Sequence, residues 1–365
     1  MREIAIQPLN LDTYVRHLAF SSIAELKNYI ISNIPRHVYY SSARYQEPGN
    51  PVMDEKKWLG SDLVFDIDAN EIYECIEKGM VVQLRFCKKC GYVVDQQEVK
   101  TCPNCGSELS RFEHVEPECI TMAKNHAAKL IDVLEQDFGF TNIYTAFSGN
   151  RGFHIVVELD EDYRYMSSDE RREIVSYIKL DEQQINYIVR NLVKGLKKAV
   201  PLIPRITDGG IRRRIALVLA NYVEKDVKAY IMELRSTISY AEARKAYAIL
   251  LEHIADISKA LSIAIDPKVT IDISHLVRMP NSINGKTGWI AVFIKNNDLS
   301  NFEFTSEIVK PIDTKLKIKF TVGIPKITII DTQLKFSKGD EVVLEYPYAS
   351  YFIFKEVAQV VSIMR

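Results

Sequence analysis

The chain has 365 residues, of which 47% are hydrophobic and 26% are charged. This composition is typical of a folded protein with a large core, and the length favours two domains over one. Lysine and arginine number 47 against 48 acidic residues, giving a net charge of -1. A global basic field for nucleic acid is therefore excluded, and any such partner must be met by a local patch.

The N-terminus lacks the long apolar stretch of a signal peptide, and the longest apolar runs are far too short to span a bilayer. We therefore predict an intracellular protein with no membrane partner. In that setting the six cysteines indicate metal or core roles rather than disulfides.

Hydrophobic periodicity and turn residues predict mixed α/β structure in the first part of the chain. Pro117 near the start and Gly139 at the end bound a long helix. The expected elements are a helix over 22–34, strands over 37–45 and 62–68, a long helix over 117–140, and a β-hairpin over 142–158.

From Ser167 the pattern changes, because Ser167 and Glu170 form a capping box that opens a helix-rich stretch reaching about residue 262. Strand patterns return over 261–272, 288–294, 315–322 and 326–331. We predict an α/β (α+β) core made of residues 1–166 and 263–365, an inserted helical subdomain over 167–262, and a small cysteine module over about 85–111.

Two carboxylates lie within the apolar strand "LVFDIDAN", at Asp66 and Asp68. Side chains alternate along a strand, so both acids point to the same side, opposite Phe65 and Ile67. Two such close carboxylates repel, and a divalent cation beside them relieves both the repulsion and the cost of burial. The alternative is a strand end at the surface with solvated acids.

Four cysteines form two C-x2-C pairs separated by eleven residues, and a glycine follows each pair. The pairs are Cys87 with Cys90 and Cys102 with Cys105. This spacing is typical of structural Zn²⁺ held by four thiolates, a closed site without an open position for catalysis. Cys75 and Cys119 lie outside the pattern and are interpreted as small buried hydrophobic residues.

The turn "SGNRGFH" combines Ser148, Arg151 and His154. Its backbone N–H groups and the guanidinium can bind phosphate. His154 begins a strand, so a core histidine is the alternative.

The chain resembles the catalytic small subunit of archaeal and eukaryotic DNA primase in four features that occur in the same order. These are "FDID", the cysteine module, "SG-x-RG-x-H" and "HLVRMPNSINGKTG". The likeness covers roughly residues 63–294. It implies a primase-type catalytic core that makes short RNA, or also DNA, primers on single-stranded DNA from nucleoside triphosphates. It also implies a partner large subunit that carries an iron–sulfur cluster.

The resemblance implies further residue roles. Asp66, Asp68 and Asp266 would bind catalytic Mg²⁺ or Mn²⁺, with Asp266 on a later strand. Asp272 is the competitor for the third position, although it suits a helix N-cap. The residues implied in nucleotide binding are Ser148, Arg151, His154, Arg278 and Lys286.

The chain departs from the family pattern at two positions. Asn150 stands where some members have a second arginine, and Asn284 stands where many have a histidine. An amide at Asn284 can form hydrogen bonds but carries no charge.

A basic cluster also lies between residues 194 and 214. Three interpretations stay open: a solvated helix face, a contact with a phosphate backbone, or ion pairs inside the fold between the helical subdomain and the core. Its members are Lys194, Lys197, Lys198, Arg205 and Arg212–Arg214.

Two rival functions are a related primase-polymerase acting in repair or on a plasmid, and a zinc-bearing nucleic-acid-binding subunit that has lost catalysis. The presence of all three aspartates argues against the second.

Overall fold

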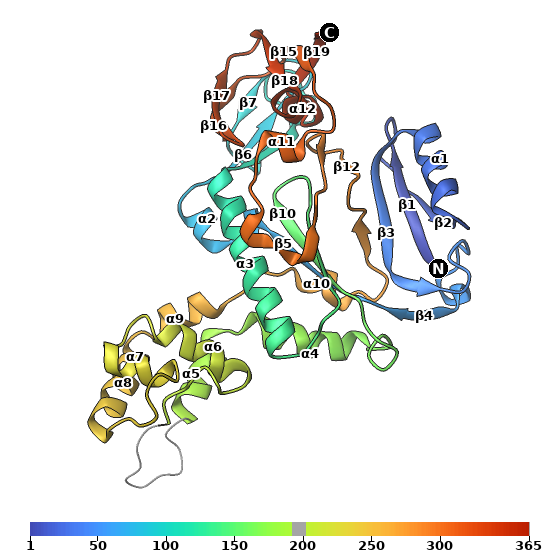
Figure 1. The fold of residues 1–365 in the computed structure, drawn as a ribbon. Helices are drawn as coiled ribbons and strands as arrows, with labels where there is room; N and C mark the ends of the chain where they lie inside the picture. The colour runs from blue at the N-terminus through green and yellow to red at the C-terminus, as the bar shows by residue number, and fades with distance from the viewer. Residues whose placement is uncertain (192–201, 365) are drawn as a thin grey trace. The chain divides into compact units, whose positions relative to one another are not determined.

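The computed structural model describes residues 1–191 and 202–364 (Figure 1). Contacts within the chain group its residues into two compact units. The larger comprises residues 1–127, 142–171 and 266–365, and the smaller comprises 128–141 and 172–265. The mixed α/β class is confirmed, whereas the domain boundaries expected from the sequence stay a prediction. Among the described residues, no helix is long and apolar enough to cross a membrane.

The first sheet of the larger unit is antiparallel, in the order β11-β3-β1-β2, with β4 paired to β3. Its strands are β1 (Arg2–Pro8), β2 (Val15–Leu18), β3 (Pro35–Tyr45), β4 (Trp58–Ser61) and β11 (Leu276–Arg278). Helix α1 (Ile23–Asn33) packs against Ile4, Ile6 and Val38. The Ser22 hydroxyl accepts a hydrogen bond from the Glu25 amide and caps this helix. The predicted helix over 22–34 and strand over 37–45 are confirmed.

The second sheet has the order β14-β9-β10-β5 and is antiparallel throughout. Its strands are β5 (Leu63–Asp68), β9 (Ile143–Phe147), β10 (Gly152–Val157) and β14 (Phe293–Ile294). Strands β5 and β10 lie side by side in the centre of the larger unit (Figure 1). Their register places His154 opposite Asp66. The predicted strand over 62–68 and the predicted hairpin are confirmed.

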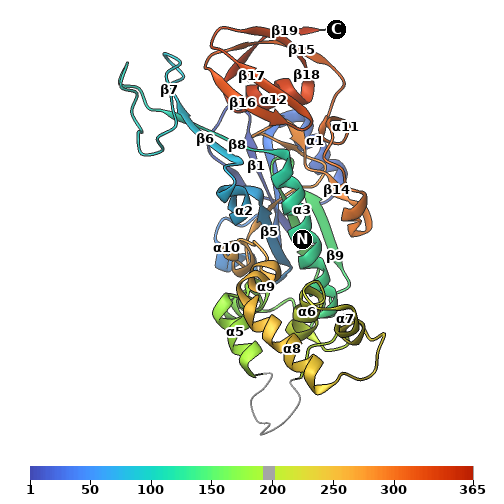
Figure 2. The same cartoon turned by 90° about the vertical axis from the view of Figure 1, so that its left-hand side faces the viewer.

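Helix α3 (Pro117–Gln136) has the predicted position, and the chain leaves it at Gly139 with a φ of 75°. Between β5 and α3 lie α2 (Tyr73–Glu77) and a sheet in the order β7-β6-β8. Its strands are β6 (Val81–Phe86), β7 (Val93–Val94) and β8 (Ser110–Val115). Figure 2 shows β7 and the adjoining loops projecting beyond the end of β6.

The smaller unit is helical. The predicted capping box lies among the last residues of the larger unit before the chain enters the smaller one, and it is confirmed, since the Glu170 amide donates to the Ser167 hydroxyl while the Ser167 amide donates to the Glu170 carboxylate. Apolar residues of α5 to α9 form one core around Ile185, Ile215 and Leu250. The described helices here are α4 (Ser168–Lys179), α5 (Glu182–Asn191), α6 (Gly210–Leu219), α7 (Lys225–Ile231), α8 (Tyr240–Glu252) and α9 (Ile254–Leu261).

The strand predicted over 261–272 is wrong. Residues 267–271 form helix α10 (Pro267–Ile271) instead. Asp266 is its N-cap and accepts a hydrogen bond from the Lys268 amide, while Pro267 occupies the first helical turn. A proline after a capping acid starts a helix because its fixed φ suits the first turn and its missing N–H is not needed there. The alternating apolar residues before it had suggested a strand.

The strand predicted over 288–294 is divided between two sheets. Strand β13 (Trp289–Ile290) pairs with β12 (Ile283–Asn284), whereas β14 pairs with β9. The strands predicted over 315–322 and 326–331 are confirmed. The last elements are α11 (Ser306–Val309), β15 (Lys315–Phe320), β16 (Ile324–Ile329), β17 (Thr332–Phe336), β18 (Glu341–Glu345), α12 (Tyr346–Phe354) and β19 (Ala358–Met364).

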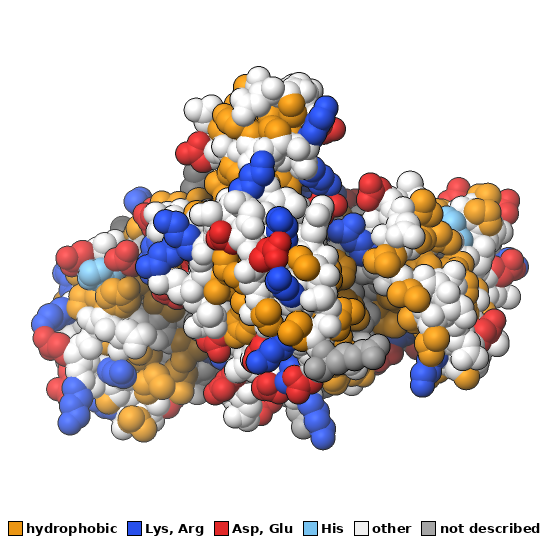
Figure 3. Space-filling model, turned by 90° about the horizontal axis from the view of Figure 1, so that it is seen from above, with side chains coloured by type: hydrophobic (Ala, Val, Ile, Leu, Met, Phe, Trp, Pro, Cys, Tyr) orange, Lys and Arg blue, Asp and Glu red, His pale blue; other side chains and the backbone are white. Residues whose placement is uncertain are grey.

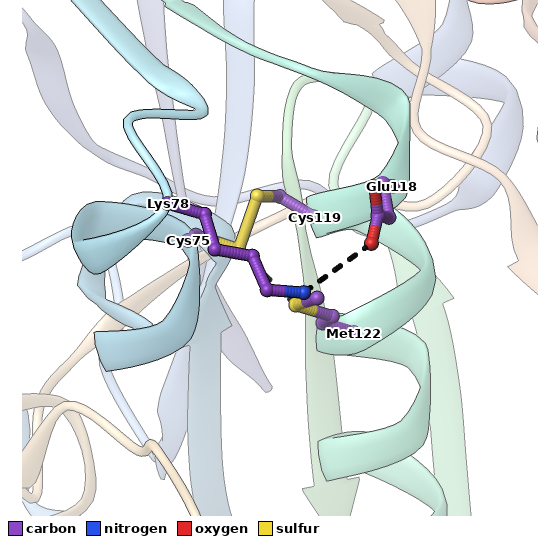
Figure 4. The surroundings of a disulfide bond; sticks show 5 residues. All are labelled: Cys75, Lys78, Glu118, Cys119 and Met122. Carbon is purple, nitrogen blue, oxygen red and sulfur yellow. Dashed lines mark hydrogen bonds and ion pairs between the residues drawn. A yellow bond between two sulfur atoms is a disulfide. The ribbon is translucent and has the colours of Figure 1, made fainter.

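Cys75 and Cys119 are buried as predicted, but they form a disulfide, which corrects the expectation of free thiols. The bond joins α2 to the first turn of α3, beside the ion pair of Lys78 with Glu118 (Figure 4). The two cysteines are 44 residues apart in sequence but only 5.8 Å apart between Cα atoms. Sequence spacing cannot show such a pairing, because the chain passes through the whole intervening cysteine module before Cys119 comes back beside Cys75.

Replacing both Cys75 and Cys119 with alanine is expected to lower the melting temperature by several degrees. A bond closing a loop of this length restricts the unfolded chain by about 3–4 kcal/mol. Calorimetry of the variant against oxidised and reduced wild-type protein measures this effect. Equal melting temperatures for the oxidised wild type and the variant would contradict it.

Candidate active site

A polar cavity of about 170 Å³ opens beside β5 and β10 in the larger unit. Both predicted acids of β5 line it. Phe65, which precedes Asp66, and Ile67, which lies between the two acids, are fully buried. The predicted common face of the two acids is therefore confirmed. Other residues around the cavity are Tyr39, Ser148, Asn150, His154, His275, Arg278, Asn284 and Lys286.

The surroundings of Asp66 oppose its ionisation. Burial raises the pKa of its carboxyl well above the usual value, and the nearby charges of Asp68 and Asp266 raise it further. Its Oδ1 atom is buried without a hydrogen-bond partner, 3.6 Å from Nε2 of His154. An acid held in this way has an open lone pair and like-charged neighbours, which suits a cation ligand.

Asp266 reaches this region through the start of α10. Its backbone N–H donates to the backbone carbonyl of Asp66 at 3.0 Å. The predicted strand position of Asp266 is thus wrong, but the side chain is near Asp66, whose pKa it raises. The three aspartates do not converge on one point. Within residues 1–191 and 202–364, only the four cysteines bring three or more possible ligand atoms within 4.8 Å of one another.

Asp272, the competitor, is the C-cap of α10 rather than an N-cap. Its carboxylate accepts hydrogen bonds from the amide and hydroxyl of Ser274 and lies 3.6 Å from Nδ1 of His275. The hydrogen bond to His275, with those to Ser274, lowers the pKa of Asp272 to about 2. This carboxylate therefore already has local partners.

The turn at Ser148 is fastened to the segment around Asn284. The Asn284 amide donates to the Ser148 carbonyl at 2.8 Å, and the Thr287 hydroxyl donates to the Gly149 carbonyl at 2.6 Å. Asn284 is only 2% exposed. An amide at this position thus acts as a structural link between the two segments, a role that could not be assigned from the sequence.

Gly152 closes the same turn tightly against β5. A Cβ atom there would lie 2.1 Å from the carbonyl oxygen of Ile67 and 2.7 Å from Oδ1 of Asp68. Glycine is thus required for the close approach of β10 to the acidic strand. The Ser148 hydroxyl accepts a hydrogen bond from the Gly152 amide at 3.2 Å, which orients it within the turn.

Arg278 lies at the cavity on β11, and two residues not singled out from the sequence hold it. Its guanidinium donates to Nδ1 of His37 at 2.7 Å and to the hydroxyl of Tyr39 at 3.0 Å. Burial, reinforced by the charge of Arg278, lowers the pKa of His37 to about 3. His37 is accordingly a neutral acceptor that orients the guanidinium of Arg278.

His154 is mostly buried, as a core histidine would be, yet it also lines the cavity, as a phosphate-binding residue would. Burial lowers its pKa to about 4, and the Arg278 charge acts in the same direction. The ring is therefore neutral near pH 7. Lys286 is exposed and borders the same cavity.

Arg151 does not line this cavity with the other turn residues. Its Nη2 lies 3.2 Å from Oδ2 of Asp68, and its Nη1 pairs with the carboxylate of Glu113 on β8. Its Nε atom is buried without a partner. Sequence analysis did not identify Glu113 as a partner of Arg151, because no motif or residue spacing connects strand β8 with the turn.

The four predicted zinc ligands converge. Their sulfur atoms lie within 4.8 Å of one another, with 3.4 Å between Cys87 and Cys105 and 3.5 Å between Cys90 and Cys102. A tetrahedral Zn²⁺ with bonds of about 2.3 Å needs sulfur separations of roughly 3.8 Å. The cluster therefore has the composition and size of a four-thiolate zinc site. Gly91 and Gly106 turn with φ of 73° and 70° after each pair.

The described arginines of the basic cluster are engaged within the smaller unit. Arg205 pairs with Glu233, Arg212 with Asp208, and Arg213 with Asp132. Arg214 is 5% exposed and donates to the carbonyl of Leu261 at 3.0 Å. The pair of Arg213 with Asp132 on α3 agrees with the interpretation of ion pairs between the predicted helical subdomain and the predicted core, whereas the pairs of Arg205 and Arg212 stay within the predicted subdomain. Lys194, Lys197 and Lys198 lie outside the described residues. In the view of Figure 3, basic and acidic side chains are interspersed.

Acidic and basic side chains around one polar cavity suit an enzyme that acts on phosphate groups. Residues 109–295 match the family model described as DNA primase small subunit. The chain is 35% identical to the DNA primase small subunit PriS of Staphylothermus marinus over 363 residues, which cover 99% of this chain and 89% of that protein.

Two further relatives carry the same description. Identity with PriS of Saccharolobus solfataricus is 32% over 371 residues, covering 100% of this chain and 90% of the relative. Identity with PriS of Sulfurisphaera tokodaii is 37% over 309 residues, covering 84% and 74%. The chain belongs to the DNA primase small subunit family, as its motifs indicated. This membership implies an enzyme of the nucleotidyltransferase type that serves DNA replication.

Proposed function

We propose that the chain is a primase catalytic subunit that starts short RNA primers, and can also incorporate deoxynucleotides, on single-stranded DNA. The observation that carries this proposal is the cavity in which Asp66 and Asp68 face Arg278 and Lys286. Nucleotidyl transfer needs this combination, because it requires positioned phosphates and neutralised charge rather than a covalent protein intermediate.

The acidic side of the cavity fits divalent cations. Asp66, Asp68 and Asp266 would hold Mg²⁺ or Mn²⁺, and the unpartnered Oδ1 of Asp66 supports this assignment. Bound there, such ions lower the pKa of the attacking 3′-hydroxyl and stabilise charge on the phosphates and pyrophosphate. The protein's own part is to fix the carboxylates in position on β5 and at the start of α10.

Other residues that line the cavity supply the groups for the triphosphate. Arg278, oriented by the neutral His37, and Lys286 provide positive charge. Ser148 and His154 provide a hydroxyl and a neutral ring, which can hydrogen-bond phosphate oxygens. Arg151 would present its Nη2, which lies beside Asp68, to the phosphates.

The remaining assignments follow the family. The four-cysteine cluster would carry structural Zn²⁺, and a large subunit bearing an iron–sulfur cluster would be the partner. Nucleoside triphosphates and single-stranded DNA would be the substrates. The domain division would be a core over 1–166 and 263–365 with helices 167–262 inserted.

A primer-synthesis assay tests the proposal. Purified chain, alone and with its large subunit, is incubated with single-stranded DNA, labelled nucleoside triphosphates and Mg²⁺ or Mn²⁺, without a supplied primer. Template-dependent products support a primase. Products only with a supplied primer would favour a repair or plasmid polymerase, and binding of DNA without any synthesis would favour a non-catalytic subunit.

Replacing Arg151 with alanine is expected to raise the KM for nucleotide by about one to two decades, because a charge-assisted contact contributes roughly 1.5–3 kcal/mol. Arg151→Lys should recover only part, since the forked geometry is lost. Affinity for single-stranded DNA should barely change. His154→Ala should act in the same direction. A lower melting temperature with an unchanged KM would make the turn purely architectural.

A further inference from the structure

Two carboxylates from separate elements hold the guanidinium of Arg151. Asp68 on β5 contacts Nη2, and Glu113 on β8 contacts Nη1. The two arginine nitrogens are thus divided between an acid of the cavity and an acid outside it. The Arg151 side chain is 19% exposed, so it has little freedom to take another position in water.

Glu113 is itself fixed by its neighbours. Its carboxylate accepts hydrogen bonds from Gln83 at 3.0 Å and Asn70 at 3.4 Å, and it pairs with Arg111 at 2.9 Å. Its backbone carbonyl accepts a hydrogen bond from Lys355 at 2.7 Å. Glu113 is only 13% exposed, and its strand register sets it directly opposite Gln83. It is therefore a rigid anchor.

We propose that Glu113 is a positioning residue that holds Arg151 in the orientation that receives the nucleotide triphosphate. This inference rests on the proposed function. Without Glu113, Asp68 is the carboxylate that remains paired with Arg151 in this contact among the described residues. The guanidinium would then be drawn onto a carboxylate needed for cations, and would have to reorganise before it could meet phosphate.

The place of Glu113 in the chain connects its contact with Arg151 to the four-cysteine module. Strand β8 leads directly out of the four-cysteine module, and Leu109, the residue before β8, packs against Cys87 and Cys102. The module thereby contributes a residue to the surroundings of the cavity, although its four sulfur atoms take no part in the reaction.

The test compares Glu113→Gln with Glu108→Gln, an exposed glutamate of the same module. Binding of Mg²⁺–ATP is measured by calorimetry, alongside KM, kcat and melting temperature. Glu113→Gln is expected to weaken ATP binding and raise KM about tenfold, by analogy with the lower end of the roughly 10–100-fold losses seen when residues that orient metal ligands are removed. The value of kcat at saturation should stay within about twofold, and Glu108→Gln should match wild type.

Two further variants separate positioning from simple stabilisation. Glu113→Asp keeps the charge and should bind ATP with intermediate affinity. In the double variant Glu113→Gln/Arg151→Ala, affinity should fall no further than in Arg151→Ala alone, because both changes remove one shared contact. Additive losses would overturn the inference.

The outcomes distinguish the two proposals. Wild-type protein that makes no primers would overturn the proposed function. Wild-type protein that binds ATP and makes primers, with Glu113→Gln unchanged in affinity, would overturn only the role of Glu113. A lower melting temperature with native ATP affinity, or tighter ATP binding in Glu113→Gln, would overturn it as well.

Discussion

Asp68→Ala is expected to reduce primer synthesis by at least about a thousandfold while the protein stays folded. Losing even one preorganised hydrogen-bond donor in an active site costs about 10²–10³ in rate, and a cation ligand contributes more than that. Asp66→Ala and Asp266→Ala should have effects of the same size. Primer synthesis at saturating nucleotide and Mn²⁺ measures the loss, and circular dichroism verifies the fold.

Asp272→Ala is the matched control for Asp266→Ala, because both acids flank α10. Its carboxylate is engaged by Ser274 and His275, so its removal should act on stability and leave synthesis mostly intact. Full loss of synthesis in Asp272→Ala, with near-native rates in Asp266→Ala, would reverse the assignment.

Stability gives an independent check on the acids. Because the pKa of Asp66 is raised in the folded state, ionising it destabilises the metal-free protein as pH rises above the ordinary value of 3.8. In the presence of a chelator, Asp66→Asn should therefore melt at a higher temperature than wild type near pH 8. The difference should disappear at a pH below 3.8. A lower melting temperature at pH 8 would contradict this electrostatic account.

Cys102→Ser is expected to abolish stoichiometric zinc binding and to disorder the module over 85–111. Structural Zn²⁺ contributes roughly 10–16 kcal/mol of apparent binding free energy in zinc-finger peptides, so removing one of four thiolates should leave the loops without their main support. Elemental analysis should find about one zinc per wild-type chain. Limited proteolysis should cut the variant within the module.

Cys119→Ser serves as the control for this substitution, since it removes a buried cysteine that lies outside the four-sulfur cluster. It should retain zinc while losing the disulfide. Wild-type protein without metal, or with disulfides among the four cysteines, would refute the zinc site.

Short-range features could be predicted from the sequence because their cause lies within one element. Asp66 and Asp68 share a face through the alternation of a strand, and Ser22 and Ser167 cap helices that begin directly after them. The two cysteine pairs each turn back within a few residues, which leaves their sulfur atoms close together. Spacing alone is enough for such features.

Pro267 and Asp266 show where short-range patterns compete. Alternating apolar residues predicted a strand, but a capping acid followed by proline began a helix. The local hydrogen bond from the Lys268 amide satisfies a helix end, and in the described structure these residues form no ladder with a strand.

Other contacts depend on how distant segments meet. Glu113 reaches Arg151, Asn284 reaches the Ser148 carbonyl, and Cys75 reaches Cys119 only after whole sheets have paired in one register. The sequence by itself determined which acids, cysteines and turn residues are the candidates for the chemistry, since those patterns are local. The tertiary structure decided which groups hold and orient them, because that choice depends on strand register and loop closure between segments far apart in the chain.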